Sequence, residues 1–408
     1  MDSKSFQTST GAQRPPLDGM IVVDLTRVLS GPYCTMQLAD MGARVIKIER
    51  PGAGDDTRAW GPPFIHGESS YFLSINRNKE SITLNFKHPE GRRILDELIA
   101  RADILVENFR PGTLHDMGLD YESLSAKHPR LIYASISGFG HTGPLRERAG
   151  YDAVLQGEAG LMSITGAAEG PGFKVGVAIV DIVSGMFAAQ GILLALVARE
   201  RSGRGQHVDV GMLDAVAALL TYQAGIYFAT GVPPKRLGNA HPTVVPYETF
   251  QAADGDVVLA VGNEDLWRRF CVVAGLEALV TDPRFATNRD RVLHYDALRP
   301  ILVETFRRRP RADWMAALIE AGVPAGSVRD LGEVLNDAQL LARGMVESVT
   351  HSHAGELKVL GVPIKLSETP GKVRRPPPRL GEHTECVLMT DLGMSASGVA
   401  ELRQAGVI

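Results

Sequence analysis

The sequence predicts an α/β protein built around a parallel sheet, with a second, smaller domain. Residues 20–25 (MIVVDL) form an apolar run typical of a buried strand, and residues 44–49 (RVIKIE) form another. Between them Pro32 suits the first turn of a helix that we expect to continue to about Asp40, where Gly42 ends it. This strand–helix–strand order is typical of nucleotide-binding α/β folds.

The following chain continues the alternation of strands and helices. We expect strands at residues 81–86, 103–107, 131–136 and 205–212, an amphipathic helix at 89–100 and a long helix at 213–228. In open α/β sheets ligands bind at the carboxyl ends of strands. Polar residues that follow predicted strands therefore suggest an anion-binding rim, formed by Arg50, Lys87, Asn108 and Arg110.

One carboxylate stands out in the segment of residues 176–185 (GVAIVDIVSG). Asp181 ends a short apolar run and opens an apolar segment of helical character, residues 182–197. An Asp at this place is most often a helix N-cap. The same position also suits a nucleophile, because the positive field of a helix N-terminus stabilises negative charge. The small residues that follow, such as Ser184 and Gly185, would let a substrate approach. Asp152 also resembles an N-cap.

A change in composition near residues 231–236 (GVPPKR) predicts a linker. Beyond it, two short strands are expected in 247–261 around the turn at 254–256, then helices at 264–275 and within 295–322. Residues 345–366 predict further strands, and a final helix follows 375–384. We therefore expect a flexible tail at 1–16, a large domain at 17–230 and 329–408, and a small domain at 231–328.

Composition limits the classes of function. The 408 residues carry a formal net charge of −4, so no bulk attraction to nucleic acid or to a membrane is expected. The three cysteines are widely spaced, which favours a reducing compartment, and we expect a cytoplasmic protein. The apolar stretch 186–197 is too short to span a bilayer. His351 and His353 lack partners for a metal site, and the missing GxGxxG disfavours an NAD-dependent dehydrogenase.

Several motifs occur in the order found in one enzyme family. They are Gly31-Pro32-Tyr33, residues 45–52 (VIKIERPG), 76–79 (NRNK), 106–109 (VENF), Gly150-Tyr151-Asp152, 178–185, 202–206 (SGRGQ) and 380–384 (LGEHT). The chain resembles the class III coenzyme A transferases, the group that includes formyl-CoA:oxalate and carnitine CoA transferases. Residues 50–64 are most similar to the succinyl-CoA:glutarate branch, and the resemblance runs from about Leu17 to the C-terminus.

The resemblance implies roles for individual residues. Asp181 matches the aspartate that forms an aspartyl-CoA thioester. Five residues match positions that contact CoA: Val28, Arg50, Leu84, Lys87 and Asn108. Tyr71, Tyr151 and Asp152 match positions that line the acyl pocket. The family fold is an interlocked homodimer of chains with a Rossmann-like large domain and a small domain. CoA thioesters are its substrates, and no tightly bound cofactor or metal is implied.

The same resemblance leaves alternatives. Asp116 stands where the oxalate enzyme has a CoA-contacting arginine, and Leu29 replaces a glutamine of its active site. The related 2-methylacyl-CoA racemases have a histidine where this chain has Tyr151, and a tyrosine of pKa near ~10 is a poor base at neutral pH. A racemase therefore ranks below a transferase, and a non-catalytic CoA-binding paralogue ranks third. We expect an acyl-CoA such as succinyl-CoA as donor and a dicarboxylate as acceptor.

A dicarboxylate acceptor needs a cation for its distal carboxylate. The candidates in the sequence are Arg58, Arg77, Arg146 and Arg148.

Overall fold

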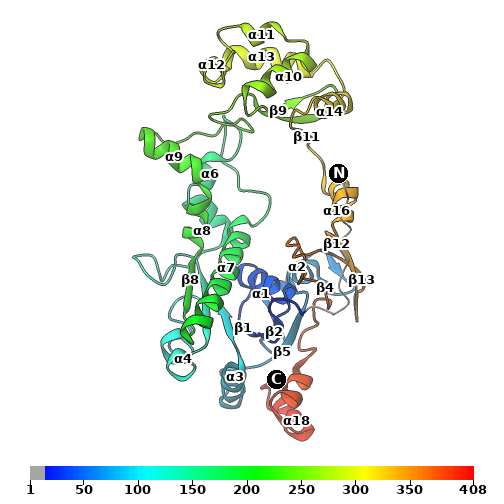
Figure 1. Ribbon diagram of the computed structural model, residues 1–408. Helices are drawn as coiled ribbons and strands as arrows, with labels where there is room; N and C mark the ends of the chain where they lie inside the picture. The colour runs from blue at the N-terminus through cyan, green and yellow to red at the C-terminus, as the bar shows by residue number, and fades with distance from the viewer. Residues whose placement is uncertain (1–13) are drawn as a thin grey trace. The chain divides into compact units, whose positions relative to one another are not determined.

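The computed structural model describes residues 14–408, so most of the predicted tail at 1–16 lies outside the described residues (Figure 1). The chain divides into two compact units. The first unit contains the described residues up to Ala159, then Gly176–Thr221 and Ala338–Ile408. The second contains Gly160–Val175 and Tyr222–Asp337, so it encloses the predicted small domain at 231–328 and adds residues 160–175, 222–230 and 329–337, which were predicted in the large domain.

The first unit is built on a six-stranded sheet of order β5-β2-β1-β6-β7-β8, in which every neighbouring pair is parallel. The sequence predicted this parallel sheet. One strand lies two residues earlier than predicted, because β5 begins at Lys79 rather than at residue 81. The six strands are β1 (Ile21–Asp24), β2 (Arg44–Glu49), β5 (Lys79–Thr83), β6 (Ile104–Glu107), β7 (Ile132–Ser137) and β8 (His207–Gly211).

Helices cover both faces of this sheet, as its buried strands require. Alternate strand residues, such as Val23 and Ile46, share a core with α3 (Pro89–Arg101) and the C-terminal helices α17 (Thr384–Thr390) and α18 (Ala396–Gln404). Helices α1 (Ser30–Asp40) and α7 (Ile179–Ser202) pack on each other, α1 against β1 and β2 and α7 against β7 and β8. Since successive strand residues point to opposite faces, α1 and α7 cover the face opposite α3.

Helix α7 is longer than the sequence predicted. It starts at Ile179, two residues before Asp181, and ends at Ser202, where Gly203 adopts a left-handed conformation with φ +70°. Its 24 residues are long and apolar enough to cross a membrane by length and composition alone, a test that core helices of soluble proteins also pass. The prediction from residues 186–197 that no apolar segment reaches that length was therefore wrong for this helix.

The predicted long helix at 213–228 was also wrong. It is divided into α8 (Met212–Leu219), in the first unit, and α9 (Thr221–Thr230), which belongs to the second unit from Tyr222 on, and Thr221 has a positive φ of +34° that interrupts the helical path. The remaining elements of the first unit are short: the 3-10 helix η1 (Asp56–Ala59), β3 (Phe64–Ile65), β4 (Glu68–Ser69), α2 (Ser70–Ile75), α4 (Tyr121–Lys127), α5 (Asp152–Glu158), α16 (Ala338–Ala342), and the hairpin β12 (Val346–His351) and β13 (Gly355–Leu360).

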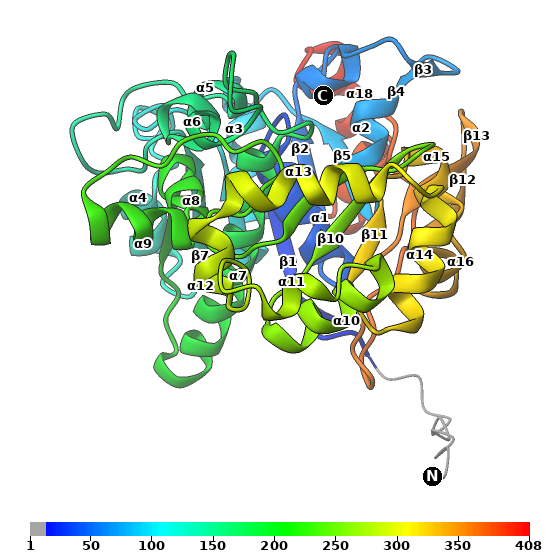
Figure 2. The ribbon, with the colours of Figure 1, turned by 90° about the horizontal axis from the view of Figure 1, so that it is seen from above.

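The second unit has its own apolar core. Its antiparallel sheet has the order β11-β10-β9, and buried Trp267, Phe306 and Trp314 lie in the core beside it. Figure 2 shows its longer helices around these strands. The elements are β9 (Tyr247–Gln251), β10 (Asp256–Ala260), β11 (Ala325–Ser327), α6 (Leu161–Ile164), α10 (Glu264–Ala274), α11 (Ala278–Thr281), α12 (Asn288–Leu293), α13 (Tyr295–Phe306), α14 (Arg311–Glu320) and α15 (Leu331–Leu335).

Candidate active site

A cavity opens at the carboxyl end of the sheet, beside the point where the strand order changes direction. Strands β1 and β6 are neighbours there, and the loops that follow them lead away on opposite sides. Such a switch point is the usual ligand site of open α/β sheets. The cavity has a volume of about 150 Å³ and lies within the first unit. Its lining includes Arg27, Val28, Ser30, Asn108, Ser137, Arg148, Tyr151, Asp181 and Met212.

The loops after β1 and β6 are tied together by Asn108. Its side-chain oxygen accepts a hydrogen bond from the Arg27 amide at 2.9 Å, and its side-chain nitrogen donates to the Arg27 carbonyl at 2.7 Å. The sequence predicted Asn108 as a CoA contact. The structure shows that its side chain holds one wall of the cavity to the other.

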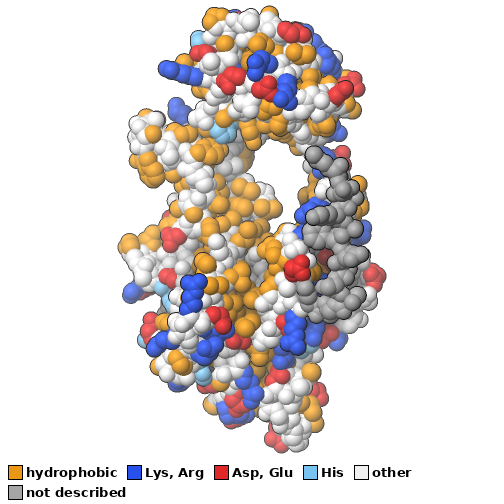
Figure 3. Space-filling model, viewed as in Figure 1, with side chains coloured by type: hydrophobic (Ala, Val, Ile, Leu, Met, Phe, Trp, Pro, Cys, Tyr) orange, Lys and Arg blue, Asp and Glu red, His pale blue; other side chains and the backbone are white. Residues whose placement is uncertain are grey.

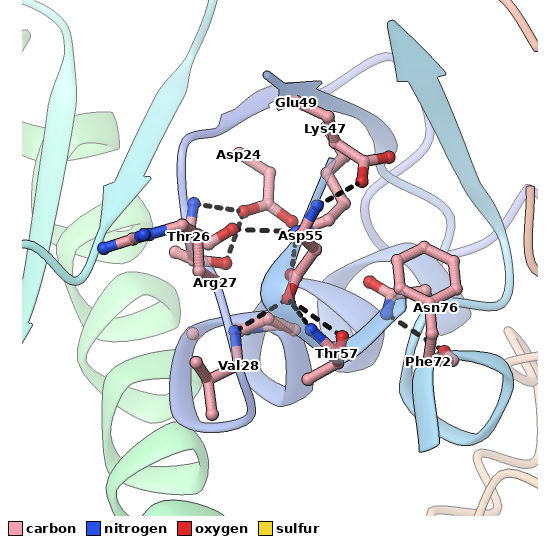
Figure 4. Close-up of polar contacts among 12 residues, drawn as sticks. Asp24, Thr26, Arg27, Val28, Lys47, Glu49, Asp55, Thr57, Phe72 and Asn76 are labelled. Carbon is pink, nitrogen blue, oxygen red and sulfur yellow. Dashed lines mark hydrogen bonds and ion pairs between the residues drawn. The ribbon is translucent and has the colours of Figure 1, made fainter. Parts of the chain in front are cut away.

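Val28 lies in the same loop in a strained conformation. Its φ is +69°, which is rare for a β-branched residue and costs on the order of 1–3 kcal/mol. The Val28 amide donates to Asp55 Oδ1 at 3.2 Å, and Asp55 also accepts from the amide and hydroxyl of Thr57 (Figure 4). Asp55 therefore fixes the conformation that places Val28 in the cavity wall.

Buried ion pairs lie beside this loop and support it (Figure 4). Lys47 Nζ lies 2.9 Å from Asp55 Oδ2 and donates to the Thr26 carbonyl at 2.8 Å, while Lys79 Nζ lies 3.2 Å from Asp24 Oδ2. Burial alone would raise the pKa of Asp24, but Lys79 and Lys47 outweigh it and lower that pKa. Burial is likewise outweighed at Asp55, where Lys47 and the Thr57 hydrogen bonds lower the pKa to about 2.

Asp181 is in a different electrostatic situation. It lies in the first turn of α7 and is not the N-cap, which is Ala178 with no side-chain cap. Burial, and next the charge of Asp152, raise the pKa of Asp181 to about 7. The sequence predicted that the helix N-terminus would stabilise charge here, yet burial and Asp152 outweigh that field. The result is a carboxylate of unusual basicity facing a cavity, as expected of a functional group.

Asp152 is the residue that supports α7. The sequence suggested an N-cap of its own helix, but the N-cap of α5 is Tyr151 and Asp152 is the first helical residue. Its Oδ1 instead accepts from the Val180 amide at 2.8 Å, and its Oδ2 accepts from Gln156 Nε2 at 2.7 Å. Asp152 thus satisfies an N-terminal amide of a different helix, and it is not among the residues that line the cavity.

The two predicted acyl-pocket tyrosines differ in position. Tyr151 lines the cavity, and 66% of its surface is exposed. Tyr71 is not among the lining residues and packs edge-on against Trp60, with ring centroids 5.1 Å apart. Burial, and next the charges of Asp181 and Asp152, raise the pKa of Tyr71 to about 12. Tyr71 is therefore a neutral hydroxyl near the carboxylate pair.

A second cavity lies beside the first, and Arg27 and Phe109 line both. It has a volume of about 400 Å³, and its lining contains Arg50, Leu84 and Lys87, three residues that the sequence predicted as CoA contacts. Leu84 and Phe86 supply apolar surface, and the cations supply charge for phosphate groups. Arg110 lines the first cavity, but Asp116, which replaces an expected arginine, lines neither.

The structure separates the four arginines proposed for a distal carboxylate. Arg58 forms two hydrogen bonds of 2.7 Å to Glu49, and Arg77 forms two of 3.0 and 2.6 Å to Asp40; both side chains are largely buried and neither lines the cavity of Asp181. Arg146 pairs with Glu147 and does not line the cavity of Asp181. Only Arg148 among the four lines that cavity, where it also pairs with Glu158.

The residues of the cavity wall that sequence reasoning missed include Ser30, Ser137 and Met212. Ser30 is the first residue of α1, Ser137 is the last residue of β7 and Met212 is the first residue of α8. Their positions at the end of a strand or the start of a helix could have revealed them in the sequence, because these ends meet at the carboxyl edge of the sheet. No group of three or more His, Cys, Asp and Glu residues that could hold a metal occurs within residues 14–408.

Comparisons with known proteins identify the family of this chain. The family model described as CoA-transferase family III matches residues 17–384. The chain is 42% identical to the mouse succinyl-CoA:glutarate CoA-transferase, covering 96% of this chain and 90% of the mouse protein. It is 44% identical to the succinate–glutarate CoA-transferase of Agrobacterium fabrum, covering 92% and 96%. It is 43% identical to the acetyl-CoA:oxalate CoA-transferase of Acetobacter aceti, covering 92% and 96%.

Solved structures show the same fold. A CAIB/BAIF family protein from Brucella suis is 44% identical with a TM-score of 0.81, covering 92% of this chain and 99% of that one. Rv3272 from Mycobacterium tuberculosis is 30% identical with a TM-score of 0.82, covering 91% and 99%. The fold and the site thus define an acyl-CoA enzyme. The chain belongs to CoA-transferase family III, whose members transfer CoA between acyl-CoA thioesters and carboxylates.

Proposed function

We propose that this enzyme transfers CoA from succinyl-CoA, or a similar acyl-CoA, to a dicarboxylate through a thioester on Asp181. The observation that carries the proposal is the geometry of Asp181, a basic carboxylate in a cavity that has a second, cation-lined cavity beside it. A CoA whose phosphates lie near Arg50 and Lys87 would extend its thioester toward Asp181. The named activities of the mouse and Agrobacterium relatives support succinyl-CoA and glutarate as the first substrates to test.

The reaction needs two covalent steps in each direction. An Asp181 oxygen attacks the donor thioester carbonyl, the carbon–sulfur bond breaks, and a mixed anhydride and CoA thiolate form. The thiolate attacks the Asp181 carbonyl, the anhydride bond breaks, and the donor acid leaves with the electron pair. The acceptor carboxylate then reverses both steps and regenerates Asp181. Dividing the exchange in this way is covalent catalysis, and positioning of CoA supplies proximity.

Arg148 is the residue we propose for the acceptor's distal carboxylate. It lines the cavity of Asp181, and its guanidinium is oriented by Glu158 at 2.6 and 2.9 Å and lies 5.2 Å from the centroid of the Phe139 ring. The Arg148 side chain is 45% exposed, so an acceptor carboxylate can reach this planar cation and compete with Glu158 for it. Replacing Arg148 with methionine should raise the KM for glutarate far more than that for a monocarboxylate of equal length. An equal effect on both acids would contradict this assignment.

We also propose that the working enzyme is a cytoplasmic homodimer. In the single chain several apolar side chains of α7 are exposed, among them Met186 at 50%, Leu194 at 63% and Val197 at 55%. Figure 3 shows hydrophobic side chains gathered over the region of α7 and α1. A second copy would cover this face, and light scattering of the purified protein tests for it. The free cysteines Cys34, Cys271 and Cys386 suit a reducing compartment.

The decisive experiment is to incubate the protein with succinyl-CoA and measure its intact mass. The proposal expects a covalent CoA adduct, which hydroxylamine converts to a hydroxamate at Asp181. It also expects one acid of a glutarate-containing panel to discharge the adduct. No adduct, combined with exchange of deuterium from solvent into a 2-methylacyl-CoA, would instead identify a racemase. Tight CoA binding with neither reaction would identify a non-catalytic CoA-binding protein.

A further inference from the structure

The N-terminus of α1 is open toward the cavity that holds Asp181. Helix α1 starts at Ser30, and its N-cap, Leu29, makes no side-chain cap hydrogen bond. Within residues 14–408 no acceptor is found for the amides of Ser30 and Gly31, and Ser30 lines the cavity. By contrast, the Val180 amide in the first turn of α7 is occupied by Asp152. The uncapped end of α1 therefore retains amides that could bind negative charge.

A close contact between helices brings this end of α1 to the nucleophile. A Cβ atom added to Gly185 would lie only 2.5 Å from the Ser30 carbonyl oxygen, so the glycine allows α1 to approach α7. Gly185 follows Asp181 by four residues, and residues four apart lie on the same face of a helix. Asp181 is therefore on the face of α7 that meets the start of α1.

A second, independent feature of the same cavity is the hydroxyl of Ser137. This residue is only 4% exposed, it lines the cavity, and its Oγ has no hydrogen-bond partner in the described part of the chain. Buried hydroxyls are almost always paired, and an unpaired one costs about 1–3 kcal/mol. Ser135, two residues earlier on β7, is paired, with its Oγ 2.9 Å from His207 Nε2. An unpaired hydroxyl in an active-site wall is therefore a candidate ligand for substrate.

We propose that the Ser137 hydroxyl and the amide of Ser30 form an oxyanion site for the reaction at Asp181. This inference rests on the proposed covalent function. Each covalent step passes through a tetrahedral carbon whose oxygen gains a negative charge, first on the substrate carbonyl and then on the Asp181 carbonyl. Ser137 donates a hydrogen bond and keeps its proton, so no proton is transferred. Fixed donors and a helix N-terminus stabilise such an oxygen more strongly than the ground-state carbonyl.

The test is to replace Ser137 with alanine and measure both steady-state transfer and the rate of CoA adduct formation. Loss of one oxyanion donor typically lowers kcat by about 10²–10³-fold. We expect a fall in this range with the KM for acyl-CoA within about twofold of the wild type, since CoA binding is unaffected. Ser137→Thr, which keeps a hydroxyl, should recover most of the lost rate. Ser135→Ala is the matched control on the same strand and should retain wild-type kcat.

Four outcomes decide the matter. A wild-type kcat for Ser137→Ala would overturn the oxyanion site while leaving the aspartyl adduct intact. A rise in KM without a fall in kcat would assign Ser137 to substrate binding alone and also overturn it. Failure of the wild-type protein to form any adduct would instead overturn the proposed function. If Ser137→Ala fails to fold, Ser137→Cys keeps the volume with a weaker donor, and its kcat must fall if the inference is right.

Discussion

The carboxylates at this edge of the sheet fall into two groups with opposite properties. Asp24 and Asp55 sit beneath the cavity with Lys47 and Lys79 beside them, and their pKa values are lowered. Asp181 faces the cavity, has no basic partner among the described residues, and lies near a second carboxylate, so its pKa is raised to about 7. Burial disfavours charge in both places. The difference teaches that neighbouring cations decide which carboxylates keep a low pKa and serve as scaffold, and which one has a raised pKa.

The largest effect on CoA transfer is expected from removing the carboxylate of Asp181. Asp181→Ala should lower the rate of CoA transfer by at least about 10⁴-fold, because no nucleophile remains to form the thioester. The measurement is steady-state transfer from succinyl-CoA to glutarate, with intact mass for the adduct. CoA binding by calorimetry serves as the control and should be unchanged. Transfer at a near wild-type rate would remove Asp181 from the mechanism.

Breaking the buried ion pairs of Asp24 and Asp55 should lower the free energy of unfolding. Lys47→Met removes the cation beside Asp55, and an uncompensated buried charge costs about 3–5 kcal/mol. Chemical denaturation should show that loss in the free energy of unfolding. Lys87→Met is the control, since Lys87 forms no ion pair with the described residues, and it should change stability by less than about 0.5 kcal/mol. Equal stability of the two variants would show that the buried pairs are not structural.

The raised pKa of Asp181 should lower the free energy of unfolding at neutral and alkaline pH. Its pKa is raised from 3.8 to about 7, so between these values the folded state holds a proton that the unfolded state releases. Stability therefore falls as pH rises through this window. Asp181→Asn removes that cost, and because Asp181 is partly exposed we expect a gain of about 1–3 kcal/mol at pH 8. Thermal melts at pH 4 and pH 8 measure it, and the gain should vanish at the lower pH.

The smallest effect is expected at Asp152, whose charge contributes to the raised pKa of Asp181. Adduct formation should increase with pH through about 7, as Asp181 ionises. Asp152→Asn removes a negative charge while keeping an oxygen for the Val180 amide, so the midpoint should move to lower pH, by about 0.5–1 unit. The initial rate of adduct formation across pH measures this shift. Asp96→Asn, on the distant helix α3, should leave the midpoint unchanged, and a midpoint that stays put in both variants would dismiss the coupling.

The sequence predicted those parts of the site that depend on local pattern. The β1–α1–β2 unit follows from two apolar runs separated by a proline and a glycine, and Asp181 was found because it ends an apolar run before a helix. Resemblance to the family placed Arg50, Leu84 and Lys87 together, and they line one cavity. These features are determined within short stretches of chain, where periodicity and capping preferences act.

The rest depends on contacts between distant segments. Asp152 looks like a cap for its own helix, and only the fold shows that its oxygen reaches Val180 instead. Ser137 could not be recognised, because whether a hydroxyl is unpaired depends on every other chain segment around it. The break at Thr221 was missed for a similar reason, since a positive φ at a threonine has no local sequence signal and must be maintained by its surroundings.

The contact at Gly185 has a consequence for which substitutions the chain can tolerate. Residue 185 takes no part in the chemistry, yet any side chain there must push the carbonyl of Ser30 away, and the start of α1 with it. A library of all substitutions in α7 should therefore show very different tolerance from one position to the next. The exposed positions 186, 194 and 197 should accept many residues without loss of stability of the single chain. Position 185 should be nearly as intolerant as position 181, because the single hydrogen atom that is glycine's side chain allows the close approach between α7 and the start of α1.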